Sequence, residues 1–155
     1  MDEKFGIIHT AQRKQAIEEL KECNEVTGKF GLALSDTDLQ MLTEERFKAL
    51  QSNGRVEFGG GILKKLIFEF CDSPYVMQDN FADTIQGLQE AFYYFKNESL
   101  DEYSDDELID IMKDFFENEC QGSIEYLQES KLEEICRRKR YGETAYEEDD
   151  FDDYD

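Results

Sequence analysis

The sequence predicts an all-α domain, and three observations carry that prediction. The chain of 155 residues holds a single proline, Pro74, whereas β-sandwiches and barrels of this length need many turns marked by proline and glycine. Apolar residues recur every three or four positions in successive segments, which is the period of an amphipathic helix. Twelve Phe and eight Tyr supply bulky side chains for a core. We therefore expect a compact orthogonal bundle of about six or seven helices, in one domain over residues 1–142.

The first two helices are indicated by their apolar spacing and by the residues at their ends. A first helix is predicted over about residues 10–27, and Gly28 suits the position just past its end. A second helix is expected over about residues 35–52, with Ser35 as its N-cap and two aspartates in the first turn, where carboxylates meet the positive end of the helix dipole. The sequence Asn-Gly that ends at Gly54 stops this helix.

The middle of the chain combines a polar segment, a glycine run and a strongly apolar stretch. Residues Arg55–Phe58 alternate polar and apolar side chains, which is typical of one short strand or of an extended linker. Three glycines, residues 59–61, lead into a stretch over residues 62–71 that is apolar nearly all round and predicts the most buried helix. This helix should end before Pro74, because a residue that precedes proline disfavours helical angles.

Four more helices are predicted in the second half of the chain. A long one is expected over about residues 78–97, where aromatic and aliphatic residues alternate at spacings of three and four. Ser104 opens the sequence Ser-Asp-Asp-Glu, a capping box that starts the next helix, and Gly122 ends it. Two short helices should begin at Ser123 and Ser130, the second with another capping box, Ser-Lys-Leu-Glu.

The charge is strongly acidic, which disfavours several classes of partner. There are 38 acidic and 17 basic residues, a formal net charge of −21, so direct binding to nucleic acid or to an anionic membrane surface is disfavoured. Residues 143–155 hold eight acidic residues and no basic one, and we expect this tail to be disordered. It is either a solvated segment or an acidic ligand for a basic protein surface or for the cluster Arg137–Arg140. Its aromatic residues favour the second interpretation slightly: Tyr146, Phe151 and Tyr154.

The cysteines and the chain's beginning favour a cytoplasmic protein. No CxxC pair is present, so neither a zinc knuckle nor a dithiol redox motif is indicated, and buried free thiols are expected. The N-terminal residues lack the pattern of a signal peptide, and no stretch approaches the roughly twenty apolar residues that cross a bilayer. The four cysteines are Cys23, Cys71, Cys120 and Cys136.

The glycine run is the best candidate for a ligand site, and it has two interpretations. Glycines before a helix let the backbone approach an anion, but neither GxxxxGK[ST] nor GxGxxG is present. A tight reversal that brings the buried helix into the core explains the run without a ligand. If the run is a ligand or partner loop, its residues are drawn from the glycines and their polar neighbours on both sides: Arg55, Gly59, Gly60, Gly61, Lys64, Asp72, Asp79 and Asn80.

No catalytic residue, metal site or cofactor is predicted. His9 is the single histidine and has no nearby group of nucleophile and base, so a surface or capping role is expected for it. The acidic clusters match neither an EF-hand nor the Glu-x-x-His pairs of di-metal bundles. At the end of the long helix, Tyr93 or Tyr94 must face outward, where either ring could contact a partner or cover a neighbouring helix.

Several stretches of the sequence resemble a family of uncharacterised bacterial proteins known as a domain of unknown function. They are the run from Asn53 to Gly61, Phe70-Cys-Asp-Ser-Pro-Tyr75, Gln78-Asp-Asn80 and Phe92-Tyr-Tyr-Phe-Lys-Asn-Glu-Ser99. The resemblance covers roughly residues 30 to 130. It implies a bacterial, cytoplasmic protein and no particular activity, ligand or catalytic residue.

Three functions remain open on the sequence. The first is a non-catalytic interaction protein whose acidic surface, outward tyrosine and tail engage a basic protein partner. The second is a small-molecule or anion-binding protein, including an enzyme, that uses the loop Gly59–Gly61. The third is a nucleic-acid mimic whose carboxylates imitate a phosphate backbone. The oligomeric state is open as well.

Overall fold

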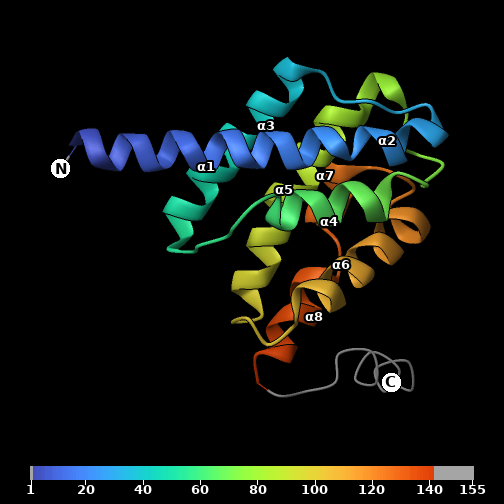
Figure 1. The fold of residues 1–155 in the computed structure, drawn as a ribbon. Helices are drawn as coiled ribbons and strands as arrows, with labels where there is room; N and C mark the ends of the chain where they lie inside the picture. Colours follow the sequence, from blue (N-terminus) through green and yellow to red (C-terminus); the bar gives the residue numbers. More distant parts are fainter. Residues whose placement is uncertain (1, 142–155) are drawn as a thin grey trace, which may run out of the picture. The chain divides into compact units, whose positions relative to one another are not determined.

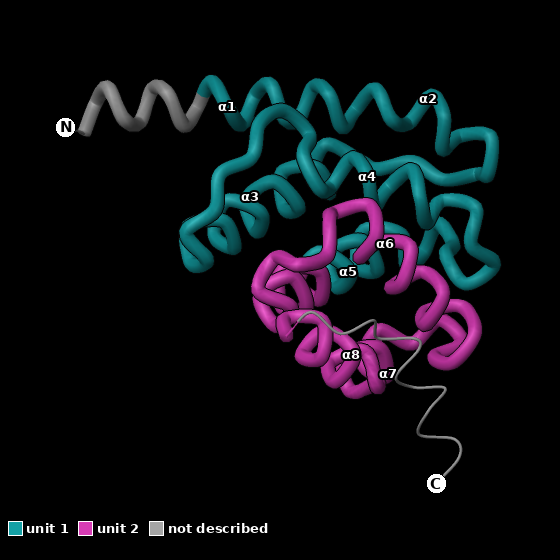
Figure 2. Tube along the Cα trace, turned by 90° about the horizontal axis from the view of Figure 1, so that it is seen from below, with its two compact units in different colours: residues 1–89 teal, residues 90–155 magenta. Residues whose placement is uncertain are grey.

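The computed structural model describes the backbone of residues 2–141 and the side chains of residues 11–141. These residues form helices and connecting turns, and the described part of the chain contains no strand (Figure 1). The prediction of an all-α fold is confirmed. The chain divides into two compact units, residues 1–89 and 90–155, and the boundary falls inside one continuous helix (Figure 2). That the units form a single domain stays a prediction.

The helices agree in order and number with the predicted segments once the two adjacent helices at the start are taken together. Unit 1 contains α1 (Asp2–Glu22), α2 (Asn24–Thr27), α3 (Asp36–Asn53), α4 (Gly61–Phe70) and the first half of α5 (Phe81–Glu98). Two 3₁₀ turns, Gly28–Phe30 and Gln78–Asn80, lie between them. Unit 2 contains the second half of α5, α6 (Asp105–Asp114) with a π-helical turn (Phe115–Glu119), α7 (Ile124–Gln128) and α8 (Leu132–Lys139).

Unit 1 is built around the contact of α1 with α3 and α4. The axis of α3 crosses that of α1 steeply (Figure 1), the arrangement expected for orthogonal packing. Helix α4, which was predicted to be the most buried helix, contributes five buried side chains from ten residues and has an outer face on which Phe68 is 38 % exposed. The buried residues of α4 are Ile62, Leu63, Leu66, Ile67 and Phe70.

Two predicted starts and one predicted stop are confirmed by the local geometry. The Ser35 hydroxyl accepts the amide of Asp38 at 3.0 Å, and the Asp38 carboxylate accepts the amide of Ser35 at 3.0 Å. Ser104 and Glu107 form the same reciprocal pair at 3.1 and 3.0 Å, and these bonds lower the pKa of Glu107. Gly54, with φ +63°, ends α3 in the left-handed conformation as expected.

The first predicted helix is wrong at its start, and its end at residue 27 agrees with the end of α2, Asn24–Thr27. Helix α1 begins at Asp2 instead of residue 10 and continues through Gly6. At the other end the backbone of Gly28 is helical, with φ −58°, and the chain continues in a 3₁₀ turn. Gly31, with φ +76°, is the left-handed residue that ends the turn, and the amide of Leu32 then donates to the Thr27 carbonyl at 3.1 Å.

One open alternative is decided and one expectation is corrected. Residues Arg55–Phe58 form an extended connection without a partner strand within the described chain. The predicted capping box at Ser130 does not form: its hydroxyl donates to the Leu127 carbonyl at 2.7 Å and accepts the amide of Leu132 at 3.2 Å. Ser130 therefore lies between the end of α7 at Gln128 and the start of α8 and bonds to both, and Glu133 lies within the first turn of α8.

All four cysteines are buried and free, as predicted.

The core of unit 2 is formed by apolar side chains of α5, α6, the π-helical turn, α7 and α8, and it includes Phe95, Met112, Phe116, Leu127 and Ile135. Across the described residues, we find no helix that combines the length and the apolar character needed to cross a membrane.

Candidate functional site

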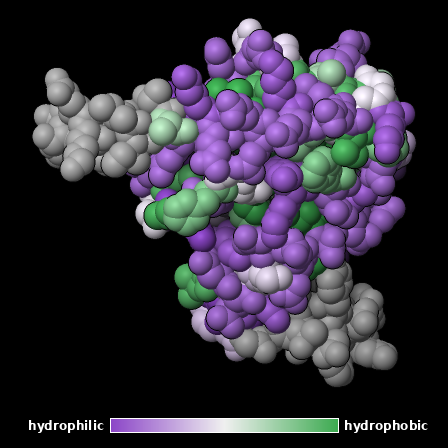
Figure 3. Space-filling model, in the orientation of Figure 1, coloured by the Kyte–Doolittle hydropathy of each residue, from purple (hydrophilic) through white to green (hydrophobic). Residues whose placement is uncertain are grey.

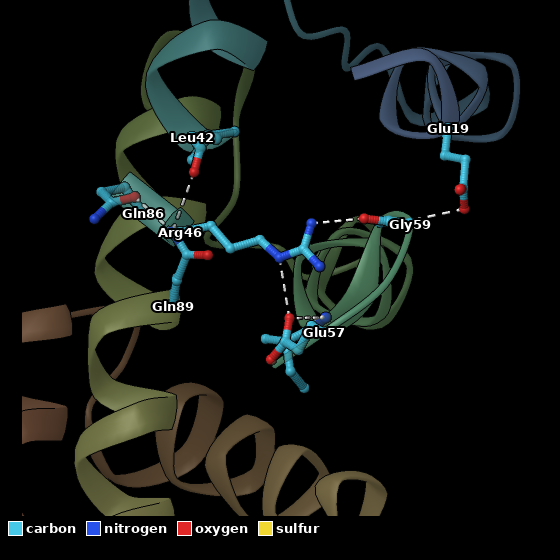
Figure 4. A network of polar contacts seen from close by, with 9 residues as sticks. Glu19, Leu42, Arg46, Glu57, Gly59, Gln86 and Gln89 are labelled. Atoms are coloured by element: carbon cyan, nitrogen blue, oxygen red, sulfur yellow. Dashed lines mark hydrogen bonds and ion pairs between the residues drawn. The ribbon is translucent and has the colours of Figure 1, made fainter. Parts of the chain in front are cut away.

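A buried arginine is the centre of a polar network in unit 1. Positions 39, 42, 46 and 50 of α3 lie on one face of the helix, and Arg46 is the one charged residue among three leucines. Arg46 is only 3 % exposed, and a buried charge is tolerated only when it is paired and hydrogen-bonded. Its Nε donates to Glu57 Oε1 at 3.0 Å and its Nη1 donates to the Gly59 carbonyl at 2.6 Å (Figure 4).

The glycine run receives carboxylates from two other parts of the chain. Glu57 Oε1, which already accepts from Arg46, also accepts the amide of Ile62 at 3.2 Å in the first turn of α4. The amide of Gly60 donates to Glu19 Oε1 of α1 at 3.3 Å. The free amides at the start of a helix attract anions, and here this chain supplies the anions itself (Figure 4).

The glycines are required by the closeness of these carboxylates. Gly59 and Gly61 have φ values of +57° and +51°, in the left-handed region. A Cβ atom at Gly61 would overlap with the Glu57 carboxylate and the Arg46 guanidinium, and one at Gly59 would overlap with the Glu19 carboxylate. The geometry therefore supports a closed chain reversal, and an external anion would have to displace Glu57 or Glu19.

The residues predicted to surround a ligand loop are only partly brought together. Arg55 is half-buried beside the network, and Lys64 is half-buried in the second turn of α4. Asp72 and Asp79 are exposed and follow the opposite end of α4, a helix about 15 Å long at 1.5 Å per residue. Asn80 stabilises the turn before α5, since it accepts the amide of Met77 at 2.9 Å and donates to the Tyr75 carbonyl at 3.2 Å.

Two hollows lie beside the network. The larger, of about 300 Å³, is bordered by α1, α3 and the connection between α3 and α4, and the smaller is about 100 Å³. Val56 and Phe58 stand at these hollows and are 76 % and 79 % exposed. The larger hollow is lined by Gln12, Arg13, Glu44, Phe47, Lys48, Leu50, Gln51, Arg55, Val56 and Glu57.

Arg46 and Glu57 were not predicted as site residues from the sequence. The signal for Arg46 was present, because a cation on an otherwise apolar helical stripe needs a buried partner. Glu57 carried a weaker signal, because in an alternating segment the apolar residues, and not the polar ones, are expected to be buried. On the other side of α3, Gln89 is 1 % exposed and donates to the Leu42 carbonyl at 3.5 Å and to Gln86 Oε1 at 2.9 Å (Figure 4).

In unit 2 a polar seam joins α5 to α8. Tyr93 is buried at 2 % exposure, so Tyr94, at 41 %, is the outward ring of the two candidates. The Tyr94 hydroxyl donates to the Glu133 carboxylate. Glu98 accepts from Arg137 at 2.7 Å, and this pair lies next to the Tyr94 contact because Arg137 also reaches Glu133 at 3.0 Å.

The basic cluster Arg137–Arg140 is engaged by carboxylates and carbonyls of the same unit. Arg138 pairs with Glu134 at 3.0 Å, and Arg140 donates to the Glu98 carbonyl at 2.7 Å. Lys139 lies over the ring of Tyr103, 5.2 Å from its centroid. The proposal that the tail docks here concerns residues 142–155, which lie outside the described residues together with Tyr146, Phe151 and Tyr154.

The hydrogen bond between Tyr94 and Glu133 predicts a pH dependence. It raises the pKa of Tyr94 to about 12, with desolvation and the negative charges of Glu133 and Glu98 adding to the effect. A raised folded-state pKa means that this contact stabilises fully below the unfolded value of about 10 and is lost as the pH rises from there to about 12. The difference in tyrosinate absorbance between the wild type and Tyr94→Phe should have its midpoint near the upper value.

Glu133→Gln is the matched variant for this titration. It removes the charge and keeps the shape, so the same difference measurement made in this background should shift the Tyr94 midpoint downwards, toward the value of a free tyrosine. A Tyr94 midpoint near 10 in the unsubstituted protein would contradict the contact.

The thiols have raised pKa values wherever a shift is resolved. Burial raises the pKa of Cys23 and Cys120, and it raises that of Cys136 to about 12, with Glu98 adding to the effect. A thiol with such a pKa carries little thiolate at neutral pH and is a weak nucleophile. Among the described side chains, no three His, Cys, Asp or Glu residues gather to hold a metal ion. The side chain of His9 lies outside this set.

Comparison with known protein families places most of the chain in one of them. A model for a family of unknown function, DUF6323, matches residues 19–145, which include the glycine run, the Arg46 network and most of both units. No curated protein matches the chain. No solved structure matches it either.

Proposed function

Because the chain belongs to a family of unknown function, DUF6323, we propose its role from its own geometry: a non-catalytic interaction module whose acidic surface binds a basic protein partner. The proposed binding surface is the outer face of α6 together with the turn that leads into it. We propose a bacterial cytoplasm as its location, which suits four buried free thiols.

The outer face of α6 presents a row of carboxylates. Asp106, Asp110 and Asp114 are all exposed and recur every fourth residue, about 6 Å apart along the helix axis. The opposite face of the same helix is buried through Leu108 and Met112. The row is therefore fixed in direction by the packing of the helix that carries it.

An apolar side chain lies on the turn that leads into this row. Leu100 is 62 % exposed, and it and Asp101 have left-handed backbones, with φ values of +51° and +62°. Such a conformation costs roughly 1–2 kcal/mol for a residue other than glycine. A partner helix with basic residues every fourth position and an apolar residue at its edge fits this combination of carboxylates and leucine.

The distribution of charge in residues 90–141 is the observation that carries the proposal. This part of the chain holds 15 acidic and seven basic residues. Basic side chains of α8 pair within the unit as described above, and Lys96 of α5 donates to the Tyr103 carbonyl at 2.6 Å and contacts Asp105 at 2.8 Å. Five of the seven basic side chains are thus used within the unit, and α6 presents the three exposed carboxylates of the row beside a single basic residue, the half-buried Lys113.

Neutralising the row should weaken binding to a basic helix. The probe is a synthetic helical peptide with lysines every fourth residue and leucines on one flank, labelled for fluorescence anisotropy. The triple variant Asp106→Asn, Asp110→Asn, Asp114→Asn is expected to bind about tenfold more weakly, since exposed charge pairs contribute roughly 0.2–1 kcal/mol each. Binding by the wild type should fall with added salt.

A second triple variant provides the control. Glu18, Glu22 and Glu25 are exposed in α1 and α2, and replacing them with glutamine changes the net charge by the same amount at a different surface. This variant should bind the peptide nearly as well as the wild type. Equal losses in the two variants, or wild-type binding that ignores salt, would contradict the proposed surface.

A further inference from the structure

We propose that the connection between α3 and α4, with the larger hollow beside it, is a self-association surface at which a second copy of this chain docks through Phe58. This inference is independent of the proposed acidic surface, which lies in unit 2. It rests on four observations made within unit 1: an inverted pattern of exposure, a fixed backbone register, a hollow beside the exposed side chains of Val56 and Phe58, and the local charge.

The pattern of exposure over residues 55–58 is the inverse of the usual one. The charged residues Arg55 and Glu57 are half-buried, whereas Val56 and Phe58 are 76 % and 79 % exposed. Alternating segments normally bury their apolar side chains, because each buried apolar side chain of this size stabilises by about 1.5–3 kcal/mol. Figure 3 shows a mostly hydrophilic face with an apolar patch over the stretch between α3 and α4.

The Arg46 network prevents the segment from reversing its register. Glu57 is held by the Arg46 guanidinium and the amide of Ile62, and the Gly59 carbonyl is held by Arg46. Turning Phe58 inward would require a one-residue shift that removes Glu57 from the buried cation. The two apolar side chains are therefore held outward in advance, so docking would require little ordering of the segment.

The hollow of about 300 Å³ lies beside Val56 and is partly apolar, through Phe47 and Leu50. A hollow of this size takes an aromatic side chain. The protruding ring of Phe58 and this hollow belong to the same face of unit 1, so a twofold contact would let each copy insert its ring into the other's hollow.

The local charge favours a second copy as the occupant. Two chains of net charge −21 repel each other wherever acidic residues are in excess. The lining of the hollow holds three basic residues, Arg13, Lys48 and Arg55, against two acidic ones. Two of these cations are paired with carboxylates of the same chain, Arg13 with Glu44 at 2.9 and 3.3 Å and Lys48 with Glu45 at 3.3 Å. The rim of the hollow therefore presents little net charge, and a second copy meets less repulsion here than at an acidic surface.

The test is the molar mass of the full chain in solution, measured by light scattering and by sedimentation from low to high micromolar concentration. The mass should rise from 18.2 kDa toward twice that value. Added salt should strengthen the association, because it screens the repulsion between the copies and leaves the apolar contact intact. Binding of a basic peptide to α6 responds to salt in the opposite direction, so the two proposals fail separately.

Phe58→Ser should abolish the association, whereas Phe30→Ser should not. Phe30 is 52 % exposed in the 3₁₀ turn that follows α2, so it is a second exposed phenylalanine at a different surface of unit 1. Both substitutions are on exposed rings, and thermal unfolding should confirm that both variants fold. A wild-type chain that stays at 18.2 kDa at every concentration and salt would overturn the proposal. A dimer that survives Phe58→Ser would overturn it as well.

Discussion

Arg46→Ala is expected to lower the free energy of unfolding by about 3–5 kcal/mol, the usual cost of removing one partner from a buried ion pair. The side chain of Arg46 is 4 % exposed and that of Glu57 is 17 % exposed, so the remaining carboxylate is poorly compensated by water. The Gly59 carbonyl loses its 2.6 Å donor at the same time. Urea denaturation measured by circular dichroism gives this difference directly.

Arg13→Ala is the control for that measurement. Arg13 pairs with Glu44 and lies 5.1 Å from the ring centroid of Phe47, but both members of the ion pair are more than 40 % exposed. An exposed pair contributes roughly 0–1 kcal/mol, so a small loss is expected. If Arg46→Ala cost no more than Arg13→Ala, the buried network would have no special role in the fold.

Gly61→Ala is expected to cost about 2–4 kcal/mol. A left-handed backbone penalises any residue with a Cβ by roughly 1–2 kcal/mol, and the added atom would also overlap with Glu57 and Arg46, a form of overpacking that costs about 1–3 kcal/mol. The polar ends of both side chains are fixed by each other, so neither moves away without breaking their contact.

Two other glycines separate the contributions to this loss. Gly31 has φ +76°, and a Cβ added there would meet no atom within 4 Å, so Gly31→Ala should show the backbone cost alone. Gly28 has a helical backbone and equally open space, so Gly28→Ala should be neutral or stabilise by up to about 1 kcal/mol. A loss at Gly61 no larger than the loss at Gly31 would mean that the loop is not closed around the carboxylate.

Much of the fold could be predicted because the signals are local. Helical periodicity and side-chain caps act within a few residues, which is why the starts at Ser35 and Ser104 were correct. The first helical segment ends at Thr27 as predicted, but the left-handed residue is Gly31 and not Gly28, because a 3₁₀ turn continues through Gly28 before the chain reverses. The resemblance to a family of unknown function is confirmed by the match over residues 19–145.

The sequence pointed to the glycine run as a candidate site but not to the side chains that contact it. Three consecutive glycines indicate that another group lies close to the backbone. The sequence does not show whether that group is an external ligand or a side chain of the same protein. The carboxylate of Glu19 is 41 residues from its partner Gly60, and Arg46 is 11 residues from Glu57, so only the packing of α1 and α3 brings them to the loop. A carboxylate of the same chain and an external anion both need a backbone without Cβ atoms at this point, so the glycines alone do not distinguish them.

This distinction separates two of the functions left open by the sequence. A phosphate cradle leaves its amides available, whereas the amides of Gly60 and Ile62 donate to Glu19 and Glu57. The glycine run thus acts as a scaffold that positions Val56 and Phe58. The proposals made above for α6 and for the connection after α3 accordingly use charge and apolar contact, and not binding of an anion at the glycine run.

A double-mutant cycle on Arg46 and Glu57 tests the closed loop most directly. The free energy of unfolding would be measured for the wild type, Arg46→Met, Glu57→Gln and the double variant, with Arg13→Met and Glu44→Gln as the exposed reference cycle. We expect a coupling energy of about 2–3 kcal/mol for the buried pair and less than about 1 kcal/mol for the exposed pair. Additive effects of Arg46→Met and Glu57→Gln would contradict the account.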